Sequence, residues 1–226
     1  MTEHKFAMHR NSAVVVACIV TSVVLTPTIQ TSAQPGKIGT VYDVEGVVTV
    51  TRQAAGSRPL AVTDAVLVQD TITTASQSRV RIGFAAGARA ELRERSVMTI
   101  ADEAGRPVIN LDNGTVHYGV SREGDRRDEP QAVLTPNAIA RTTGSLRVKV
   151  DRASDTVLVT TVCVFKGNGS AATLDGAKVE VPERNCVTVN GSVLGAVFPL
   201  PPPPTPLPPP PKPHIISAVQ MGSRTP

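Results

Sequence analysis

The stretch Arg79–Phe84 (Arg-Val-Arg-Ile-Gly-Phe) and its continuation Ala88–Leu92 (Ala-Arg-Ala-Glu-Leu) decide the fold that we predict. Apolar residues alternate with other residues in both pieces, which is the period of a half-buried β-strand. Gly87 lies between the two pieces and predicts a turn. The pattern therefore indicates a β-hairpin with one dry face. Its other face carries Arg79, Arg81, Arg89, Glu91 and, one residue on, Arg93.

Short strand patterns continue on both sides of this hairpin, from Gly39 to Val189, and no amphipathic helix of ten or more residues stands out. Glycines punctuate the series, and we expect structural turns at Gly87, Gly144 and Gly167. We predict an all-β fold, built as a solenoid-like stack of short strands, with a β-sandwich as the alternative. The clearest further strands are Val41–Thr51 with Gly46 as a candidate bulge, Val108–Leu111 and Thr115–Val120 joined by an Asn113-Gly114 turn, Leu146–Asp151, and Thr156–Phe165.

The composition argues against nucleic acid as a partner. The 226-residue chain has a formal net charge of only +4, and its basic and acidic residues are interspersed, so no broad positive field is evident. Aromatic residues make up 3% of the chain, which leaves few platforms on which bases or sugars could stack.

The N-terminus has the pattern of a secretory signal peptide. Lys5 and Arg10 precede the apolar run Ala13–Leu25, and a small-residue site ends at Ala33. We predict a signal peptide over residues 1–33, cleaved between Ala33 and Gln34, and a periplasmic or secreted mature chain that is not inserted in a membrane. The alternatives are retention of the run as an anchor and lipidation at Cys18.

Export leaves two cysteines, Cys163 and Cys186, in an oxidising compartment. We predict a disulfide between them, which would stabilise the fold by about 3 kcal/mol through loop closure. The alternative is two buried thiols, because Val162 and Val164 flank Cys163.

Two segments interrupt the β pattern. Ser121–Gln131 carries balanced charges and indicates a solvated loop, with a binding loop as the alternative. Pro199–Pro213 is mostly proline and indicates a stiff polyproline spacer or a disordered tail, or else a docking ligand. The predicted domain therefore spans residues 34–198, and the Pro-rich tail spans residues 199–226.

Catalytic and metal-binding patterns are scarce, so we predict no enzyme activity, cofactor or metal. His117 is the single histidine of the predicted domain, without a neighbouring Cys or His at metal-ligand spacing, and we interpret it as a surface or packing residue. Cys163 lies in an apolar run that disfavours a thiolate.

The order of several short motifs resembles the FecR-like domain, a module of bacterial regulators, from about Gly36 to Val189. The motifs that carry the resemblance are Gly39-Thr40-Val41, Gly46-Val47-Val48, Asp70-Thr71-Ile72, Val80–Phe84 with Gly87, Leu134–Ala138, and Thr161–Gly167. The sequence departs from the family at Thr63, Ala86 and Ser145, where the family usually has Gly, Asp and Thr. The departure at Ala86 puts any partner contact made by that Asp in doubt.

The resemblance implies an exported all-β module that binds a protein partner in the bacterial envelope. Family members that control sigma factors carry a cytoplasmic segment before a membrane span, and only about a dozen residues precede the apolar run in this chain. We therefore expect a non-catalytic module for protein binding, sensing or scaffolding. The alternatives are a signalling component that modulates an envelope receptor or anti-sigma partner, and a cell-wall polysaccharide binder.

The predicted contact surface is the outward side of the central hairpin, which carries Arg79, Arg81, Arg89, Glu91 and Arg93. An ordinary solvated sheet face is the alternative for these residues. The partner's identity and the oligomeric state are not predicted.

Overall fold

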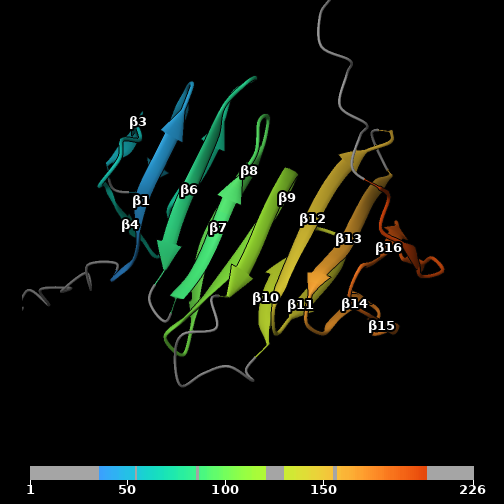
Figure 1. Cartoon of the computed structure of the whole chain (residues 1–226). Helices are drawn as coiled ribbons and strands as arrows, with labels where there is room; N and C mark the ends of the chain where they lie inside the picture. The colour runs from blue at the N-terminus through green and yellow to red at the C-terminus, as the bar shows by residue number, and fades with distance from the viewer. Residues whose placement is uncertain (1–35, 54, 85–86, 121–129, 155–156, 203–226) are drawn as a thin grey trace, which may run out of the picture. The chain divides into compact units, whose positions relative to one another are not determined.

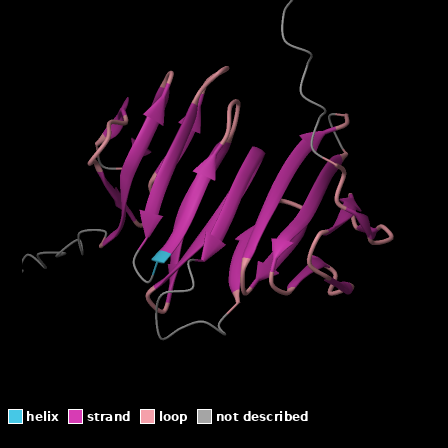
Figure 2. Cartoon of the chain, viewed as in Figure 1, coloured by secondary structure: helices cyan, strands magenta, loops and turns pink. Residues whose placement is uncertain are grey.

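The computed structural model describes residues 36–53, 55–84, 87–120, 130–154 and 157–202. Its regular elements within these ranges are strands, apart from a single 3₁₀ residue at Gly87 (Figure 2). The predicted all-β class is therefore confirmed. The predicted cleavage site at Ala33 and Gln34, Cys18, the charged segment from 121 to 129, and the tail from 203 onward lie outside the described residues.

The strands form two layers, which we call the front and back layers after their positions in Figure 1. The front layer contains β1 (Lys37–Glu45), β4 (Ala65–Leu67), β6 (Arg79–Phe84), β7 (Ala88–Leu92), the second half of β9 (Arg106–Val120), β12 (Ser145–Arg152), β13 (Leu158–Lys166), β16 (Asn185–Asn190), β17 (Val193–Leu194) and β18 (Phe198–Pro199). The back layer contains β2 (Val48–Arg52), β3 (Gly56–Pro59), β5 (Thr71–Thr74), β8 (Val97–Glu103), the first half of β9, β10 (Gln131–Leu134), β11 (Ala138–Thr142), β14 (Gly169–Thr173) and β15 (Lys178–Val181).

The chain alternates between the two layers as it advances. The hairpin β6–β7 lies in the front layer, β8 and the first half of β9 lie in the back layer, and the hairpin β12–β13 lies in the front layer again. Neighbouring strands are antiparallel, whereas β9 and β10 pair in parallel. The result is a stack of short strands that grows along one direction, as the solenoid-like prediction requires.

Gly114 moves the chain from the back layer to the front layer inside β9. The predicted Asn113-Gly114 hairpin turn is wrong, because residues 106–113 pair with β8 while residues 114–120 pair with β7 and β12. Gly114 has φ +93°, and a Cβ at this position would lie 2.0 Å from Oγ of Ser96. The same Asn-Gly signal that allows a reversal here allows a change of layer.

Gly46 makes a similar change of layer near the N-terminus of the domain. The predicted single strand Val41–Thr51 is wrong, because β1 ends at Glu45 in the front layer and β2 begins at Val48 in the back layer. Gly46 has φ +71°, and a Cβ here would meet Oγ of Ser78 at 2.4 Å. The glycine is therefore a layer crossing and not a bulge within one strand.

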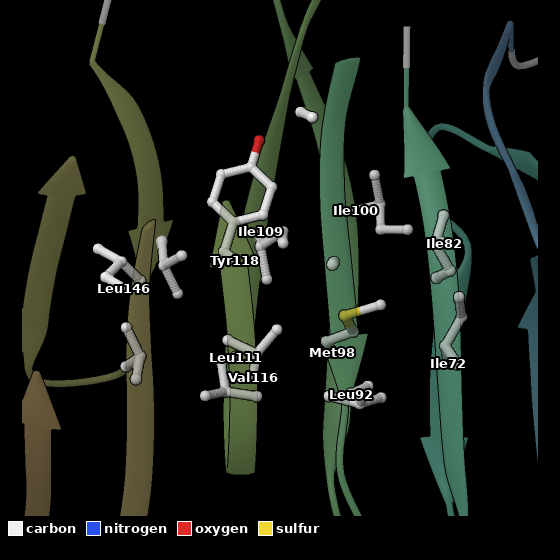
Figure 3. Packing of buried hydrophobic residues seen from close by; sticks show 14 of the residues in the cluster. Ile72, Ile82, Leu92, Met98, Ile100, Ile109, Leu111, Val116, Tyr118 and Leu146 are labelled. Atoms are coloured by element: carbon white, nitrogen blue, oxygen red, sulfur yellow. The ribbon is translucent and has the colours of Figure 1, made fainter. Parts of the chain in front are cut away.

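The hydrophobic core fills the space between the layers (Figure 3). The inward residues that the alternation predicted are buried: Val80, Ile82, Phe84, Ala88, Ala90, Leu92, Leu146, Val148 and Val150. Tyr118 is the largest fully buried side chain, and its ring meets that of Phe84 edge to face at 6.3 Å. Its hydroxyl oxygen lies 3.0 Å from Oε1 of Gln131 and 3.3 Å from the Pro107 carbonyl oxygen, so its single hydrogen has two acceptors within reach. Burial raises the pKa of Tyr118.

Asn137 ties the back layer to the front layer. Its Nδ2 lies 3.1 Å from the Leu158 carbonyl oxygen, 3.3 Å from that of Val189 and 3.0 Å from that of Gly191. Its Oδ1 accepts a hydrogen bond of 2.6 Å from Oγ1 of Thr160. Val189 and Thr160 are buried while Leu158 and Gly191 are half-buried, so the amide provides hydrogen-bond partners for polar groups at a largely buried junction of the two layers.

The last described segment forms an edge of the front layer. In β18, Phe198 pairs with Cys186 and Pro199 pairs with Asn185. The Leu200 amide then donates a hydrogen bond to the Arg184 carbonyl. Pro199, the first residue of the predicted Pro-rich tail, thus belongs to the sheet.

Candidate functional site

The predicted contact residues lie together on the outer side of the front layer. Arg79 and Arg81 belong to β6, Arg89 and Glu91 belong to β7, and Arg93 follows β7 directly. Their strand neighbours Val80, Ile82, Ala90 and Leu92 are buried. Because side chains alternate along a strand, the charged residues point away from the core.

A straight row of side chains crosses this outer side from strand to strand. Each member is the register partner of the next one, so cross-strand neighbours lie close together. The row runs Asp43, Arg81, Glu91, His117, Arg147, Cys163, Cys186. The residues two positions away on each strand form a second row beside it. Together we call the outward side chains of β1, β6, β7, β9 and β12 the charged face.

Ion pairs neutralise most of the predicted contact residues. Arg81 lies between two acids, with Nε 2.7 Å from Oε2 of Glu91 and Nη1 3.5 Å from Oδ2 of Asp43. Arg79 pairs with Glu45 and, at 3.7 Å, with Asp43. Arg93 pairs with Glu91 at 2.7 Å. These residues therefore hold three strands of the face in register and leave little net charge for a partner.

The ion pairs with Arg81 and Arg93 favour the ionised form of the Glu91 carboxyl group. Burial alone would raise the pKa of this carboxyl group, but the hydrogen bond from Arg81 and the charges of Arg93 and Arg81 outweigh it, so the pKa is lowered. The hydrogen bond that Arg81 donates to Glu91 in turn raises the pKa of Arg81. Oε1 of Glu91 is buried without a hydrogen bond of good geometry, although it lies in an ion pair with Arg93.

His117 on β9 and Arg147 on β12 lie toward one end of the face, and neither was among the contact residues predicted from the sequence. The His117 ring stacks on Phe165 with 5.9 Å between the centroids. The Arg147 guanidinium group lies 5.5 Å from the same ring centroid, and its Nη2 is 3.6 Å from Sγ of Cys163. Arg147 forms an ion pair with none of the carboxylates that the structure describes.

His117 is neutral at neutral pH. Burial lowers the pKa of His117 to about 4, and the positive charges of Arg93 and Arg147 act in the same direction, against the opposing charge of Glu91. The ring therefore offers a hydrogen-bonding group without a charge. Its stacking on Phe165 agrees with the packing role predicted for it.

A groove of about 930 Å³ opens at the end of the charged face where β9 enters the front layer. His117 and Thr115 of β9 line it, between Arg93, which follows β7, and side chains of β12. Basic residues outnumber acidic ones in the lining: Arg79, Arg93, Arg95, Arg147, Lys149 and Arg152 against Glu45, Glu94 and Asp151.

The three acids of the groove already have partners. Glu45 pairs with Arg79, and Asp151 pairs with Lys149 at 2.9 Å. Oε2 of Glu94 accepts a hydrogen bond of 2.7 Å from the Gln77 amide. An anion that entered the groove would therefore meet the guanidinium group of Arg147, which pairs with none of the carboxylates that the structure describes.

Cys163 and Cys186 are joined by a disulfide in the structure and lie directly opposite each other on β13 and β16. Both are almost completely buried although they point to the outer side. They stand at the far end of the row that begins with Asp43, next to Arg147.

The predicted turn glycines lie at points of tight or left-handed backbone. Gly87 and Gly167 have φ values of +78° and +79°. A Cβ at Gly144 would lie 2.0 Å from the Lys166 carbonyl oxygen, so the chains approach too closely there for another residue. These glycines shape the ends of the front hairpins and do not contact the groove.

Two further features bear on the kind of site. The ranges that the structure describes contain no group of three or more His, Cys, Asp and Glu side chains that could hold a metal ion. Among the same residues, no helix has the length and apolar character needed to cross a membrane.

Residues 70–168 match the family model described as FecR protein, which confirms the resemblance predicted over residues 36–189. Two crystal structures of a protein from Parabacteroides distasonis ATCC 8503, assigned as an anti-sigma factor, are 18% identical to this chain, with TM-scores of 0.45 and 0.46. The match covers 57% of each chain, so this chain spans little more than half the length of those structures. A cell surface anchoring domain is 25% identical over 28% of this chain and 84% of its own, with a TM-score of 0.27. No curated protein matches the chain.

Proposed function

We propose that this chain, which carries a FecR-like domain over residues 70–168, is a non-catalytic protein-binding module that acts in regulatory signalling at the bacterial envelope. The charged face of the front layer is its contact surface. The family relationship supports the regulatory role, and the architecture supports the binding role.

The observation that carries this proposal is the continuous row of polar side chains over five neighbouring strands, in which every member except the neutral His117 is charged. Backbone ladders hold these strands rigidly, so the face is pre-organised and loses little conformational entropy on binding. Fixed rows of charge give a protein interface its orientation and its selectivity for one partner. The ion pairs among Asp43, Arg79, Arg81 and Glu91 keep the rows in place before a partner arrives.

The chemistry of the face agrees with binding and not with catalysis. A general base works best with a pKa near the operating pH, and His117, with a pKa of about 4 and its ring packed on Phe165, is a poor one at neutral pH. Cys163 is held in the disulfide and offers no thiolate.

Export places this face outside the cytoplasm. The signal pattern of residues 1–33 and the disulfide between Cys163 and Cys186 both suit an oxidising compartment. N-terminal sequencing of the protein recovered from the periplasm and the medium tests this step. A mature chain that begins at Gln34 is the expected result, and a chain that keeps residues 1–33 contradicts it.

Site-directed photo-crosslinking in living cells tests the contact surface. A photoreactive residue in place of Lys149 on the charged face is compared with the same residue in place of Lys178, which lies on β15 in the back layer. We expect a discrete crosslinked protein from the first position and none from the second. Equal capture at both positions, or capture at neither, contradicts a contact surface on the charged face.

A further inference from the structure

We propose that the groove at the β9 crossing binds an extended acidic peptide segment, with Arg147 as the central anchor for its carboxylates. This inference deepens the proposed function and rests on it, because it names the chemistry of the protein partner. Two observations on the groove carry the inference: the charge of Arg147 and the spacing of the basic side chains that line it.

The first observation is the charge of Arg147, which lines the groove. Arg147 is half-buried, and its guanidinium group contacts Phe165 and Cys163 of the neighbouring strand β13. No carboxylate of the described residues pairs with it. A desolvated guanidinium group that lacks an anion gains most from a ligand carboxylate, which it can bind through two parallel hydrogen bonds.

The second observation is the spacing of the basic side chains. Arg147 and Lys149 stand two residues apart on β12, so they point the same way about 7 Å apart along the strand. Across the floor strand β9, Thr115 is the register partner of Lys149, and the Arg93 amide hydrogen-bonds to the Thr115 carbonyl. Arg93 therefore faces Lys149 from the other wall, with the small Thr115 between them.

An extended peptide has the same repeat as these walls. Its alternate residues are also about 7 Å apart, so carboxylates at every second position would fall in step with Arg147 and Lys149. Lys149 would then exchange its exposed ion pair with Asp151 for one with the ligand, at little cost, because exposed pairs contribute little. The arrangement favours an alternating acidic segment over a block of adjacent acids.

The lining argues against the other polyanions. Sugar rings bind largely by stacking on exposed aromatic faces. The His117 ring, which lines the groove, already stacks on Phe165, and Arg147 lies against Phe165 as well. A nucleic acid carries a phosphate every few ångströms. It would meet the three acids of the lining, whereas a peptide can place neutral residues opposite them.

Fluorescence anisotropy with the full exported chain tests the inference. The labelled probe is Gly-Glu-Ser-Glu-Ser-Glu-Ser-Gly, and the reference probes are its Gln version, a version with the three glutamates adjacent, and an oligogalacturonate as acidic glycan. Arg147→Gln is compared with Arg141→Gln, which removes the same charge from an exposed position on the back layer. We expect Arg147→Gln to weaken binding of the alternating probe about tenfold, and Arg141→Gln to weaken it less than twofold.

Several outcomes overturn the inference. They are an equal loss in both variants, equal binding of the Gln probe, stronger binding of the adjacent-glutamate probe, and stronger binding of the glycan. The proposed function is tested separately by the crosslinking at Lys149. If Arg147→Gln leaves that crosslinked partner unchanged, the charged face binds a protein but the groove is not where its acidic segment lies.

Discussion

Arg81 donates a hydrogen bond of 2.7 Å from Nε to Oε2 of Glu91, the residue that lies directly opposite it on β7. On its other side, Asp43 of β1 is also its register partner. One guanidinium group thus joins the acids of two neighbouring strands. Substitution of this residue tests whether the charged face contributes to folding as well as to binding.

We expect Arg81→Glu to lower the Tm of the protein, because the new carboxylate would face Asp43 and Glu91 without a cation between them. The matched control is Arg89→Glu, whose register partners on both sides are glycines, Gly83 and Gly119. Thermal unfolding followed by circular dichroism measures both variants. The difference should shrink in high salt. If both variants unfold at the same temperature, the ion pairs around Arg81 do not stabilise the fold.

Gly114→Ala tests the layer crossing. We expect a loss of about 2 kcal/mol or more in the free energy of unfolding, because alanine is strained at φ +93° and its Cβ would overlap Ser96. Gly176→Ala is the control, since Gly176 has φ +95° but nothing within 4 Å of the added Cβ. Urea unfolding separates the two contributions. A loss in Gly114→Ala no larger than in the control would show that Ser96 yields without cost.

Asn137→Ala should lower the free energy of unfolding by about 2–3 kcal/mol, because three backbone carbonyls lose the hydrogen bonds of Nδ2 and the Thr160 hydroxyl group loses its acceptor Oδ1 at a largely buried site. Asn113→Ala serves for comparison, since its amide makes one exposed hydrogen bond to the Arg95 carbonyl. The measurement is again urea unfolding. Similar small losses in both variants would mean that water replaces Asn137 between the layers.

His117 should titrate with a pKa of about 4 in NMR spectra of its ring protons, against 6.5 when unfolded. Because the folded protein then binds fewer protons than the unfolded chain, stability falls as the pH drops from about 6.5 to about 4. Arg147→Gln should raise this pKa, since one of the positive charges that lower it is gone. An unchanged titration in that variant would contradict the proximity of the two groups.

Cys163 and Cys186 should resist alkylation when unreduced protein, recovered from its native compartment, is denatured. Intact mass after treatment with an alkylating agent in denaturant measures this directly, and two alkylated thiols would contradict the disulfide. Replacement of both cysteines by alanine should cost about 3 kcal/mol in the free energy of unfolding, the value expected for closure of a loop of this length. Reduced and denatured wild-type protein provides the reference mass.

The buried side of the central hairpin was predictable, because a period of two leaves only one way to bury Val80, Ile82 and Leu92 together. The layer crossings were not. Gly46 and Gly114 carry the same local signal as a bulge or a hairpin turn, and the strand pairings that distinguish these outcomes involve residues far away in the sequence.

The candidate site was predictable in part for a related reason. Alternation shows that Arg147 points outward from its strand, and the same holds for Arg79 and Arg81. It does not show which strands become neighbours. The register of β12 with β9 places Arg147 beside His117, and that of β1 with β6 gives Arg81 its second acid. Pairing over such separations decides which charges are neutralised and which remain available.

The proline at the end of β18 has a consequence for self-association. The Leu200 amide points inward to Arg184, so the adjacent Pro199 presents its nitrogen atom outward, where any further strand would have to attach. Proline has no amide hydrogen to offer there, so it weakens the pairing of a further strand at this edge. The molecule is built by adding strand to strand in one direction. At this edge of the front layer, proline therefore works against fibre growth and edge-to-edge aggregation.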